Sequence, residues 1–477
     1  MNGYRSWIPP VKNNNNEEIS GLGLFIFGFS LRLIFSFWGS KYYYGDLRYT
    51  FGDSFSYTKS FINLVDKGIY TFDPSHPDAA LYRGPIYPFF WGLHYLVFGE
   101  NSVYQAVAVT QSLLDTLSGL LIYRILKELG VGAKGAALGG FLYLINPISL
   151  VHVPITGTET FATIVTLVVL YQTLKVSTPG GYLTVGLLTG VAVMTRQYIG
   201  ILLPISILCL LFRDGWTIRW REQGLTAGLV TLGFVVAVSP WFLRNYINHD
   251  TPTILMGKTT GYKAYQEDFI AFNRFFNLFM VDVTPVYNSI ALSGVTGLGE
   301  DPRFTPHIDA VNRLARRSFE CGPSFISWRD MKHGVTKSNP DAGCKDELAS
   351  NYEKLRQKFL DEHGPLFLWH VPLQNLEKAV FKSDLTSSRA GLTGWLIWAC
   401  FLLRSIFVVL GFSAVFFLRK EPRLLMVLFP LFIFLFISSV IRQVEIRYLV
   451  QCEAVLMILA TYVTAQTYNQ LRSLAIK

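Results

Sequence analysis

The chain has 477 residues, of which 51% are hydrophobic and 16% charged, and it carries a formal net charge of +9. Its mean hydropathy is positive, at +0.33, a balance that does not suit a soluble domain of this length. Stretches of about 20 apolar residues are expected to cross a membrane as helices. The composition therefore predicts an all-α polytopic membrane protein.

Apolar runs recur along the chain and predict about ten transmembrane helices. They cover roughly residues 19–41, 102–124, 135–151, 159–175, 182–198, 199–212, 225–245, 392–418, 422–440 and 448–468. Basic residues such as Arg124, Lys127, Arg213 and Arg419 gather in short connections on one side. The positive-inside rule makes that side, and with it both termini, cytoplasmic. The basic charge is thus explained by topology, and the sequence contains no aromatic and basic nucleic-acid motif.

The connection at residues 42–98 is too polar at its start to cross a membrane and too aromatic for an ordinary linker. Apolar residues recur at helical spacing behind Gly52-Asp53-Ser54, and this pattern stops at Asp66-Lys67-Gly68. We therefore expect a short amphipathic helix with Asp53 in its first turn, where the helix dipole favours a carboxylate. Tyr57 lies four residues further on, on the same face.

The second half of this connection reads Tyr82-Arg83-Gly84-Pro85-Ile86-Tyr87-Pro88. Its two prolines fix the chain, and Arg83 is available to an anion. Together with Gly-Asp53-Ser-Phe-Ser-Tyr57, the stretch resembles the first outer loop of GT-C type polyprenyl-phosphate-sugar glycosyltransferases, the group of the protein O-mannosyltransferases and the lipid A aminoarabinose transferases. That group carries an acidic residue shortly before a Tyr, then an Arg-Pro-Pro-Gly-Tyr-Pro-like stretch. Gly84 and Ile86 depart from its commonest Pro and Gly.

Glu159 lies at the start of the fourth predicted span, on the same side as Asp53. The resemblance implies an acidic residue near the catalytic carboxylate in this turn. Two carboxylates can divide roles, one accepting a proton and the other orienting substrate or a metal ion. The alternative is that Glu159 only stabilises the first turn of its helix.

Three further arginines lie in strings that resemble the same group. Arg196, in Met194-Thr195-Arg196-Gln197, either meets a lipid phosphate or extends to the headgroups without a ligand. Arg244, in Pro-Trp-Phe-Leu-Arg-Asn-Tyr, either anchors its helix or binds the donor. Arg447, in Glu445-Ile446-Arg447-Tyr448, either binds a lipid phosphate or pairs with Glu445.

Charged residues inside apolar runs are costly unless they are paired. Arg32 and Asp115 are the nearest candidates of opposite sign on successive helices, and Glu453 has Arg404 as its candidate partner. Both are expected to be structural ion pairs.

Three domains are expected. Residues 1–246 form a membrane module whose first outer loop is catalytic, residues 247–390 form an outer, periplasmic region, and residues 391–477 supply C-terminal membrane helices. The outer region has the length to cover the site and select the acceptor. Cys321 and Cys344 both lie in it, and a disulfide between them is left open.

The resemblance implies transfer of a hexosyl or pentosyl group from a polyprenyl phosphate to an acceptor hydroxyl at the outer membrane face, with inversion. Asp53 would deprotonate or orient the acceptor, and Arg83 and Arg447 would stabilise the leaving phosphate. Tyr57 and Tyr87 are further candidate substrate-binding residues. The acceptor is a lipid, a glycan or a protein, and a divalent metal ion is left open as a cofactor.

Two other classes of membrane protein are alternatives. One is a transporter or flippase of lipid-linked glycans, which predicts inverted repeats and ionisable residues near the bilayer midplane. The other is a glycan polymerase or ligase. Because the polar motifs lie mainly at the outer ends of the predicted spans, the glycosyltransferase is favoured over the transporter.

Overall fold

The computed structural model describes residues 16–50, 53–74, 77–217, 220–254, 267–278, 307–321, 342–381, 392–441 and 444–475, with residues 286, 289–290 and 296 between them. These residues contain helices and turns and no strand, which confirms the predicted all-α fold. Within the described residues, five helices are long and apolar enough to cross a membrane, at Gly21–Leu47, Ile86–Glu128, Arg221–His249, Trp398–Phe417 and Pro422–Ile441. The chain is a multi-pass membrane protein, while the predicted count of ten spans stays a prediction.

The helices of the first half are α1 (Asn16–Ile34), α2 (Ser40–Tyr44), α3 (Ser54–Lys67), α4 (Ile86–Glu128), α5 (Ala133–Leu144), α6 (Pro147–His152), α7 (Thr158–Lys175), α8 (Pro179–Thr195), α9 (Leu202–Phe212) and α10 (Trp220–His249). α4 joins the end of the 42–98 connection to the second predicted span across a kink at Gly99. The third predicted span ends early because Asn146 begins a new helix: its Oδ1 accepts a hydrogen bond from the Ile148 amide, and Pro147 follows it.

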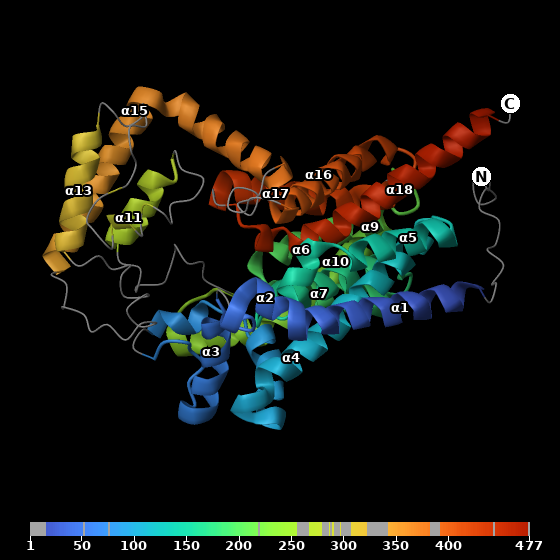
Figure 1. Cartoon of the computed structure of the whole chain (residues 1–477), viewed down its shortest axis with the longest axis horizontal. Coiled ribbons are helices and arrows are strands. Elements are labelled where there is room, and N and C mark those ends of the chain that lie inside the picture. Colours follow the sequence, from blue (N-terminus) through green and yellow to red (C-terminus); the bar gives the residue numbers. More distant parts are fainter. Residues whose placement is uncertain are drawn as a thin grey trace.

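The second half contains α11 (Glu267–Phe276), α13 (Ile308–Glu320), α15 (Ala342–Phe381), α16 (Leu392–Phe412), α17 (Leu428–Phe436) and α18 (Val450–Ala475). Figure 1 shows α11, α13 and the first part of α15 standing apart from the bundle, and α15 running back toward α16 and α17. α1 begins and α18 ends at the opposite end of the bundle. The start of α18 is therefore at the end from which α15 projects.

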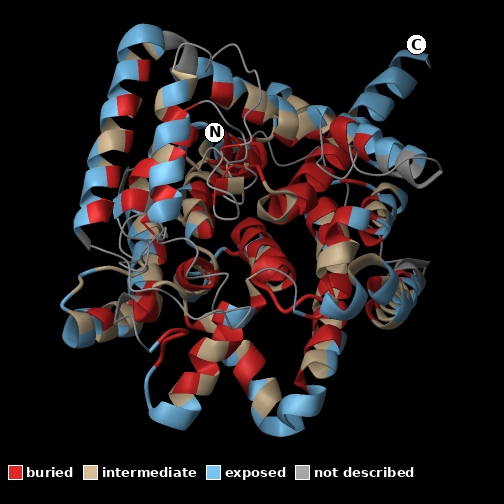
Figure 2. Ribbon diagram, turned by 60° about the vertical axis from the view of Figure 1, so that its left-hand side comes forward, coloured by how far each residue is buried: buried red, intermediate tan, exposed pale blue. Residues whose placement is uncertain are grey.

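Helices α8 and α10 pack closely through glycine residues, and α18 is buried in the middle of the bundle. A Cβ atom on Gly186 of α8 would lie 1.9 Å from the Val230 carbonyl oxygen of α10, and one on Gly233 of α10 would lie 2.1 Å from the Leu183 oxygen of α8. Glycine at both positions lets the two backbones touch, as is common between membrane helices. Every residue of α18 from Val450 to Val463 is buried, and Figure 2 shows the buried residues gathered in the middle of the bundle.

Both predicted ion pairs are confirmed. Arg32 Nη2 lies 2.6 Å from Asp115 Oδ2, and Arg404 Nη2 lies 2.7 Å from Glu453 Oε1. Buried ion pairs need further hydrogen bonds to offset the loss of water. Tyr143 OH donates to Asp115, and Arg404 Nη1 donates to the Ala379 carbonyl near the end of α15. The second pair therefore also fixes the end of α15 to the bundle.

Helices α11, α13 and α15 share a core of their own, in which Phe272, Phe275 and Phe359 are fully buried. A disulfide joins Cys321, at the end of α13, to Cys344 in α15. Much of the rest of the predicted outer region, including residues 279–285 and 322–341, lies outside the described residues.

Replacing Cys321 by Ser is expected to destabilise this part of the molecule by about 3 kcal/mol, because the disulfide closes a loop of moderate length. Its cysteines are 23 positions apart in the sequence. Thermal unfolding of the purified protein measures the loss. Cys400→Ser, which removes an exposed free cysteine, is the control and should change nothing. Equal unfolding of the two variants would contradict a stabilising disulfide.

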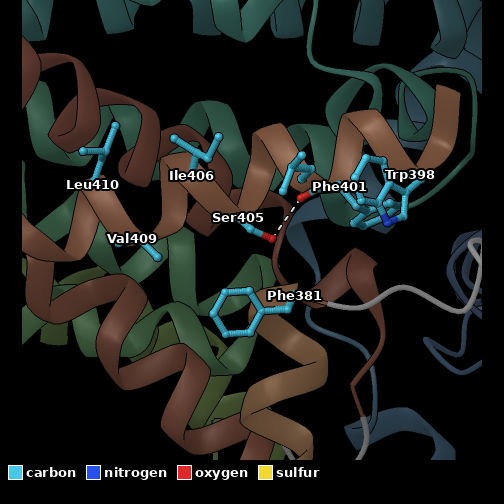
Figure 3. A pocket seen from close by; sticks show the side chains of 8 residues that line it. Phe381, Trp398, Phe401, Ser405, Ile406, Val409 and Leu410 are labelled. Carbon is cyan, nitrogen blue, oxygen red and sulfur yellow. Dashed lines mark hydrogen bonds between the residues drawn. The ribbon is translucent and has the colours of Figure 1, made fainter. Parts of the chain in front are cut away.

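An apolar groove of about 560 Å³ lies between the end of α15 and one face of α16. Figure 3 shows Phe381 facing Trp398, Phe401 and Ser405 across it. Ser405, the polar residue among its lining residues, donates its hydroxyl to the Phe401 and Val380 carbonyls, so the wall presents an apolar surface.

Candidate active site

Asp53 precedes α3 at the N-cap position, but its side chain makes no capping hydrogen bond. Its carboxylate instead lies between two guanidinium groups: Oδ1 is 3.3 Å from Arg83 Nη2, and Oδ2 is 2.9 Å from Arg447 Nη1. Arg447 follows Asp53 by 394 positions. The fold thus joins the first predicted outer loop to the start of the last helix through a carboxylate.

Arg83 is held by the first turn of α3. Its Nε donates to Ser56 Oγ (2.8 Å), its Nη1 donates to Tyr57 OH (2.9 Å), and the guanidinium carbon lies 4.3 Å from the centre of the Tyr57 ring. A Cβ atom on Gly84 would lie 1.9 Å from the Met194 carbonyl oxygen. Gly84 stands where the resembling group most often has Pro. Because it has no side chain, the loop can lie directly on the end of α8.

Glu159 and Arg196 form a second, more deeply buried pair. Arg196 Nη2 lies 2.5 Å from Glu159 Oε1, and the two side chains are 9% and 8% exposed. Arg196 Nε also donates to Thr158 Oγ1, and its Nη1 donates to Tyr198 OH, both at 2.6 Å. Because protein groups engage all three nitrogens, Arg196 does not extend to the headgroups without a partner.

The turn Ile446–Tyr448 and the first residues of α18 connect the two pairs. Arg196 Nη1 donates to the Arg447 carbonyl (3.1 Å), and Gln451 Nε2 donates to the Glu159 carbonyl (3.2 Å). Asp53, Tyr57, Arg83, Glu159, Arg196 and Arg447 therefore form one network, which we call the Asp53 cluster.

Electrostatics keep the arginines of this cluster charged. Burial lowers the pKa of Arg447, but the neighbouring Asp53 and Tyr448 outweigh burial and raise it well above its usual value. Burial also lowers the pKa of Arg83, and Tyr57 and Tyr82 outweigh it in the same way. Arg447 also forms an ion pair with Glu445. This pairing does not prevent Arg447 from binding a lipid phosphate, so the two roles that the sequence suggested for it are compatible.

Tyr87 contacts the cluster through its ring, which packs edge-on against the Tyr57 ring with the centroids 5.2 Å apart, whereas Arg244 lies outside the cluster. Tyr87 is fully buried, and its hydroxyl donates to Gln111 Oε1 (2.8 Å). Arg244 donates to the Ala80 carbonyl (3.1 Å) and the Tyr70 carbonyl (3.2 Å), with its guanidinium carbon 4.6 Å from the Trp241 ring centre. Arg244 thus fastens the 42–98 connection to α10.

Replacing Arg244 by Ala is expected to lower the free energy of unfolding by about 1.5–3 kcal/mol, because hydrogen bonds from a charged donor are lost. Thermal unfolding of the purified protein measures this effect. Arg244→Lys keeps the charge without the planar fork and should recover only part of the stability. Unchanged stability with weaker binding of a polyprenyl phosphate would instead make Arg244 a substrate ligand.

The chain is similar to known proteins both in part of its sequence and in its fold. The family model for dolichyl-phosphate-mannose-protein mannosyltransferases matches residues 75–243, a stretch that contains Arg83, Glu159 and Arg196 but neither Asp53 nor Arg447. The Archaeoglobus fulgidus oligosaccharyltransferase crystallised with Zn and sulfate aligns over 94% of this chain, with a TM-score of 0.50 and 12% identity. The fold is that of a GT-C type membrane glycosyltransferase.

Other solved structures extend this comparison. Archaeoglobus fulgidus AglB, in complex with an inhibitory peptide and a dolichol-phosphate, aligns over 97% of this chain with a TM-score of 0.52 and 12% identity. The chain spans about half the length of these oligosaccharyltransferases, 49% and 52%. ArnT from Cupriavidus metallidurans aligns at 15% identity over 94% of this chain and 78% of its own, with a TM-score of 0.38 that is too low to compare folds. No curated protein sequence matches the chain.

Some residues of this network lie in no motif of the sequence. Gln451 accepts a hydrogen bond from Tyr198 OH (3.0 Å) in addition to donating to Glu159. A glutamine inside the last apolar run is a polar residue at membrane depth, which is a signal for a buried hydrogen-bond network. Thr158 precedes Glu159 in the sequence. Its hydrogen bond with Arg196 forms only because α7 packs against the end of α8.

The described residues do not fit a divalent metal ion. They contain no group of three or more His, Cys, Asp or Glu side chains placed to hold one. A metal ion prefers carboxylate oxygens that are not already neutralised by cations, whereas Asp53 and Glu159 both contact arginines. No step of the mechanism is therefore assigned to a metal.

Proposed function

We propose that the chain transfers a sugar from a polyprenyl-phosphate donor to an acceptor hydroxyl at the outer face of the membrane, with inversion at the anomeric carbon. The observation that supports this most strongly is the carboxylate of Asp53 between Arg83 and Arg447. A site for this reaction needs fixed cations where the leaving phosphate gains charge and an anion that holds the acceptor hydroxyl. The Asp53 cluster offers both groups in one network.

Arg447 is the arginine best suited to receive the donor phosphate. Its side chain is 23% exposed, against 11% for Arg83 and 9% for Arg196. Its Nη2 contact to Tyr448 OH is long, at 3.5 Å, so a phosphate oxygen can replace it at little cost. Arg83 fixes Asp53 and Tyr57, and Arg196 with Glu159 holds the start of α18 in place.

Asp53 would hold the acceptor hydroxyl and accept its proton as the acceptor oxygen bonds to the anomeric carbon. Its two oxygens contact Arg83 and Arg447, and these two ion pairs fix the position of the carboxylate. When the bond between the anomeric carbon and the phosphate oxygen breaks, its electron pair leaves with the phosphate. Preorganised guanidinium groups stabilise that charge without further rearrangement.

The apolar groove between α15 and α16 supports a lipid-linked donor. Phe401 lines the groove and also packs with Val450 and Ile446, which flank Arg447 in the sequence. An isoprenoid chain in the groove would bury apolar surface while its phosphate reaches Arg447. AglB, with a similar fold, has been solved with a dolichol-phosphate.

We further propose that residues 1–246 form a membrane module whose first outer loop is catalytic, and that both termini are cytoplasmic. The region within 247–390 covers the site and selects a lipid, glycan or protein acceptor. The same end of the bundle carries the Asp53 cluster and α15, which supports the roles given to the loop and to the covering region.

Mass spectrometry of envelope lipids and glycans tests the proposal in an organism from which the gene has been deleted. Loss of one hexose or pentose from a defined acceptor, restored by the native gene, is the expected result and would identify both substrates. An unchanged glycan profile with altered sidedness of a glycolipid would favour the transporter instead.

A further inference from the structure

Tyr70 lies in the connection between α3 and α4, and the proposed mechanism does not use it. It comes just after α3, whose C-cap is Gly68, and it is only 6% exposed. Burial raises the pKa of Tyr70, so its hydroxyl stays protonated and can donate a hydrogen bond. The side chain therefore offers one buried donor within this part of the chain.

The Tyr70 hydroxyl is directed at the backbone of Arg83 and Gly84. Its oxygen lies 3.1 Å from the carbonyl oxygen of each of these residues. Pro88, four residues after Gly84, has no backbone N–H with which the start of α4 could bond the Gly84 carbonyl. A carbonyl without a helical donor needs one from elsewhere, and the tyrosine hydroxyl supplies it. Tyr70 thus fixes the turn from which the Arg83 side chain extends.

Helix α10 holds Tyr70 itself in place. Arg244 Nη2 donates to the Tyr70 carbonyl (3.2 Å), and the Trp241 ring stands edge-on to the Tyr70 ring with the centroids 5.0 Å apart. The Phe89 ring, near the start of α4, stacks on Tyr70 with the centroids 6.3 Å apart. The tyrosine therefore links α10 to the backbone of Arg83.

The position of the Arg83 guanidinium matters because its contact with Asp53 is the longer of the two that hold this carboxylate. Nη2 of Arg83 lies 3.3 Å from Oδ1, whereas Nη1 of Arg447 lies 2.9 Å from Oδ2. A shift of about 1 Å would carry the Arg83 contact past the ~4 Å limit of an ion pair. The grip on Asp53 thus depends on where the backbone places Arg83.

Resting on the proposed sugar transfer, we propose that Tyr70 is a positioning residue of the reaction. Its hydroxyl holds the backbone of Arg83 and Gly84 so that the guanidinium meets Asp53, while Arg447 receives the donor phosphate. Tyr70 does not touch the reacting atoms. Its loss lowers the rate at saturating donor and leaves donor binding as it is, because a displaced Arg83 no longer fixes the carboxylate that accepts the proton.

The test is the rate of transfer by Tyr70→Phe as the amount of donor is varied. Phenylalanine keeps the ring contacts with Trp241 and Phe89 and removes only the hydroxyl. Full-length variants are reconstituted in vesicles with membrane acceptors and graded amounts of polyprenyl-phosphate sugars, both extracted from the deletion organism, and mass spectrometry follows the product. Rates are compared per amount of folded protein, which thermal unfolding measures.

Tyr143→Phe is the matched control, because it also removes the hydroxyl of a buried tyrosine. The Tyr143 hydroxyl donates to Asp115 (2.5 Å) within a structural ion pair of the bundle. This variant should unfold at a lower temperature and keep the native rate at saturating donor. A double variant, Tyr70→Phe with Arg83→Gln, tests the route, since losing the Tyr70 hydroxyl should cost nothing further once the guanidinium is gone.

Tyr70→Phe is expected to lower the saturating rate by about 10–10²-fold, the cost of displacing a catalytic group by roughly 1 Å. The half-saturating amount of donor should stay the same. A native saturating rate, even with a lower unfolding temperature, would overturn the proposal. So would a loss in the double variant that equals the product of the two single losses. If the native protein forms no product, the sugar transfer itself is refuted.

Discussion

Asp53→Asn is expected to lower the rate of sugar transfer by about 10²–10⁴-fold at equal expression, a loss of the size seen when a central polar catalytic group is removed. Asparagine keeps the size of the side chain but removes the negative charge between Arg83 and Arg447. The two cations then repel one another without a counterion, and the acceptor hydroxyl loses its strongest hydrogen-bond acceptor. The rate of product formation in membranes, followed by mass spectrometry, measures the effect.

Asp46→Asn is the matched control for this prediction. Asp46 lies in the same connection and is exposed, so its replacement should leave the rate unchanged. If Asp53→Asn also transferred sugar at the native rate, Asp53 would have no part in the chemistry.

Glu159→Gln is expected to destabilise the protein by about 3–5 kcal/mol, because it leaves the buried guanidinium of Arg196 without a counterion. The Arg196 side chain is 9% exposed, so water cannot replace the lost carboxylate. The start of α18 should loosen as well, since Arg196 also donates to the Arg447 carbonyl. Thermal unfolding of the purified protein in detergent measures the change.

The double variant Glu159→Gln/Arg196→Gln removes both charges and should recover part of the stability lost in the single variant. Native stability of Glu159→Gln together with lost transfer would contradict a positioning role and indicate that Glu159 takes part in the reaction.

The local sequence pattern was enough to predict where the helices around the site begin and end. α3 ends with Gly68 at a φ of 69°, where the helix-ending signal was expected, and α7 begins beside Glu159 as predicted. Both charge pairs within apolar runs were predicted correctly because an isolated buried charge is too costly to leave unpaired. These inferences needed only helical spacing and the sign of a charge.

Which side chains pair with one another in the site depends on tertiary contacts. A local sequence pattern does not predict those contacts. The sequence left open whether Glu159 is a helix-terminal acid or a site residue, and it did not identify Arg196 as the partner of Glu159, because α7 and the end of α8 meet only in the folded chain. Tyr87 belongs to a motif, but the motif does not say which way α4 turns the ring, and the structure turns it to Gln111.

The chemical fate of the donor lipid tests the central claim most directly. The purified protein, reconstituted in vesicles, would be supplied with polyprenyl-phosphate sugars and membrane acceptors extracted from the deletion organism. Mass spectrometry should show one free polyprenyl monophosphate formed for each sugar that appears on the acceptor. Release of a polyprenyl diphosphate would indicate a glycan polymerase or ligase. An intact donor that has only changed leaflet would contradict sugar transfer.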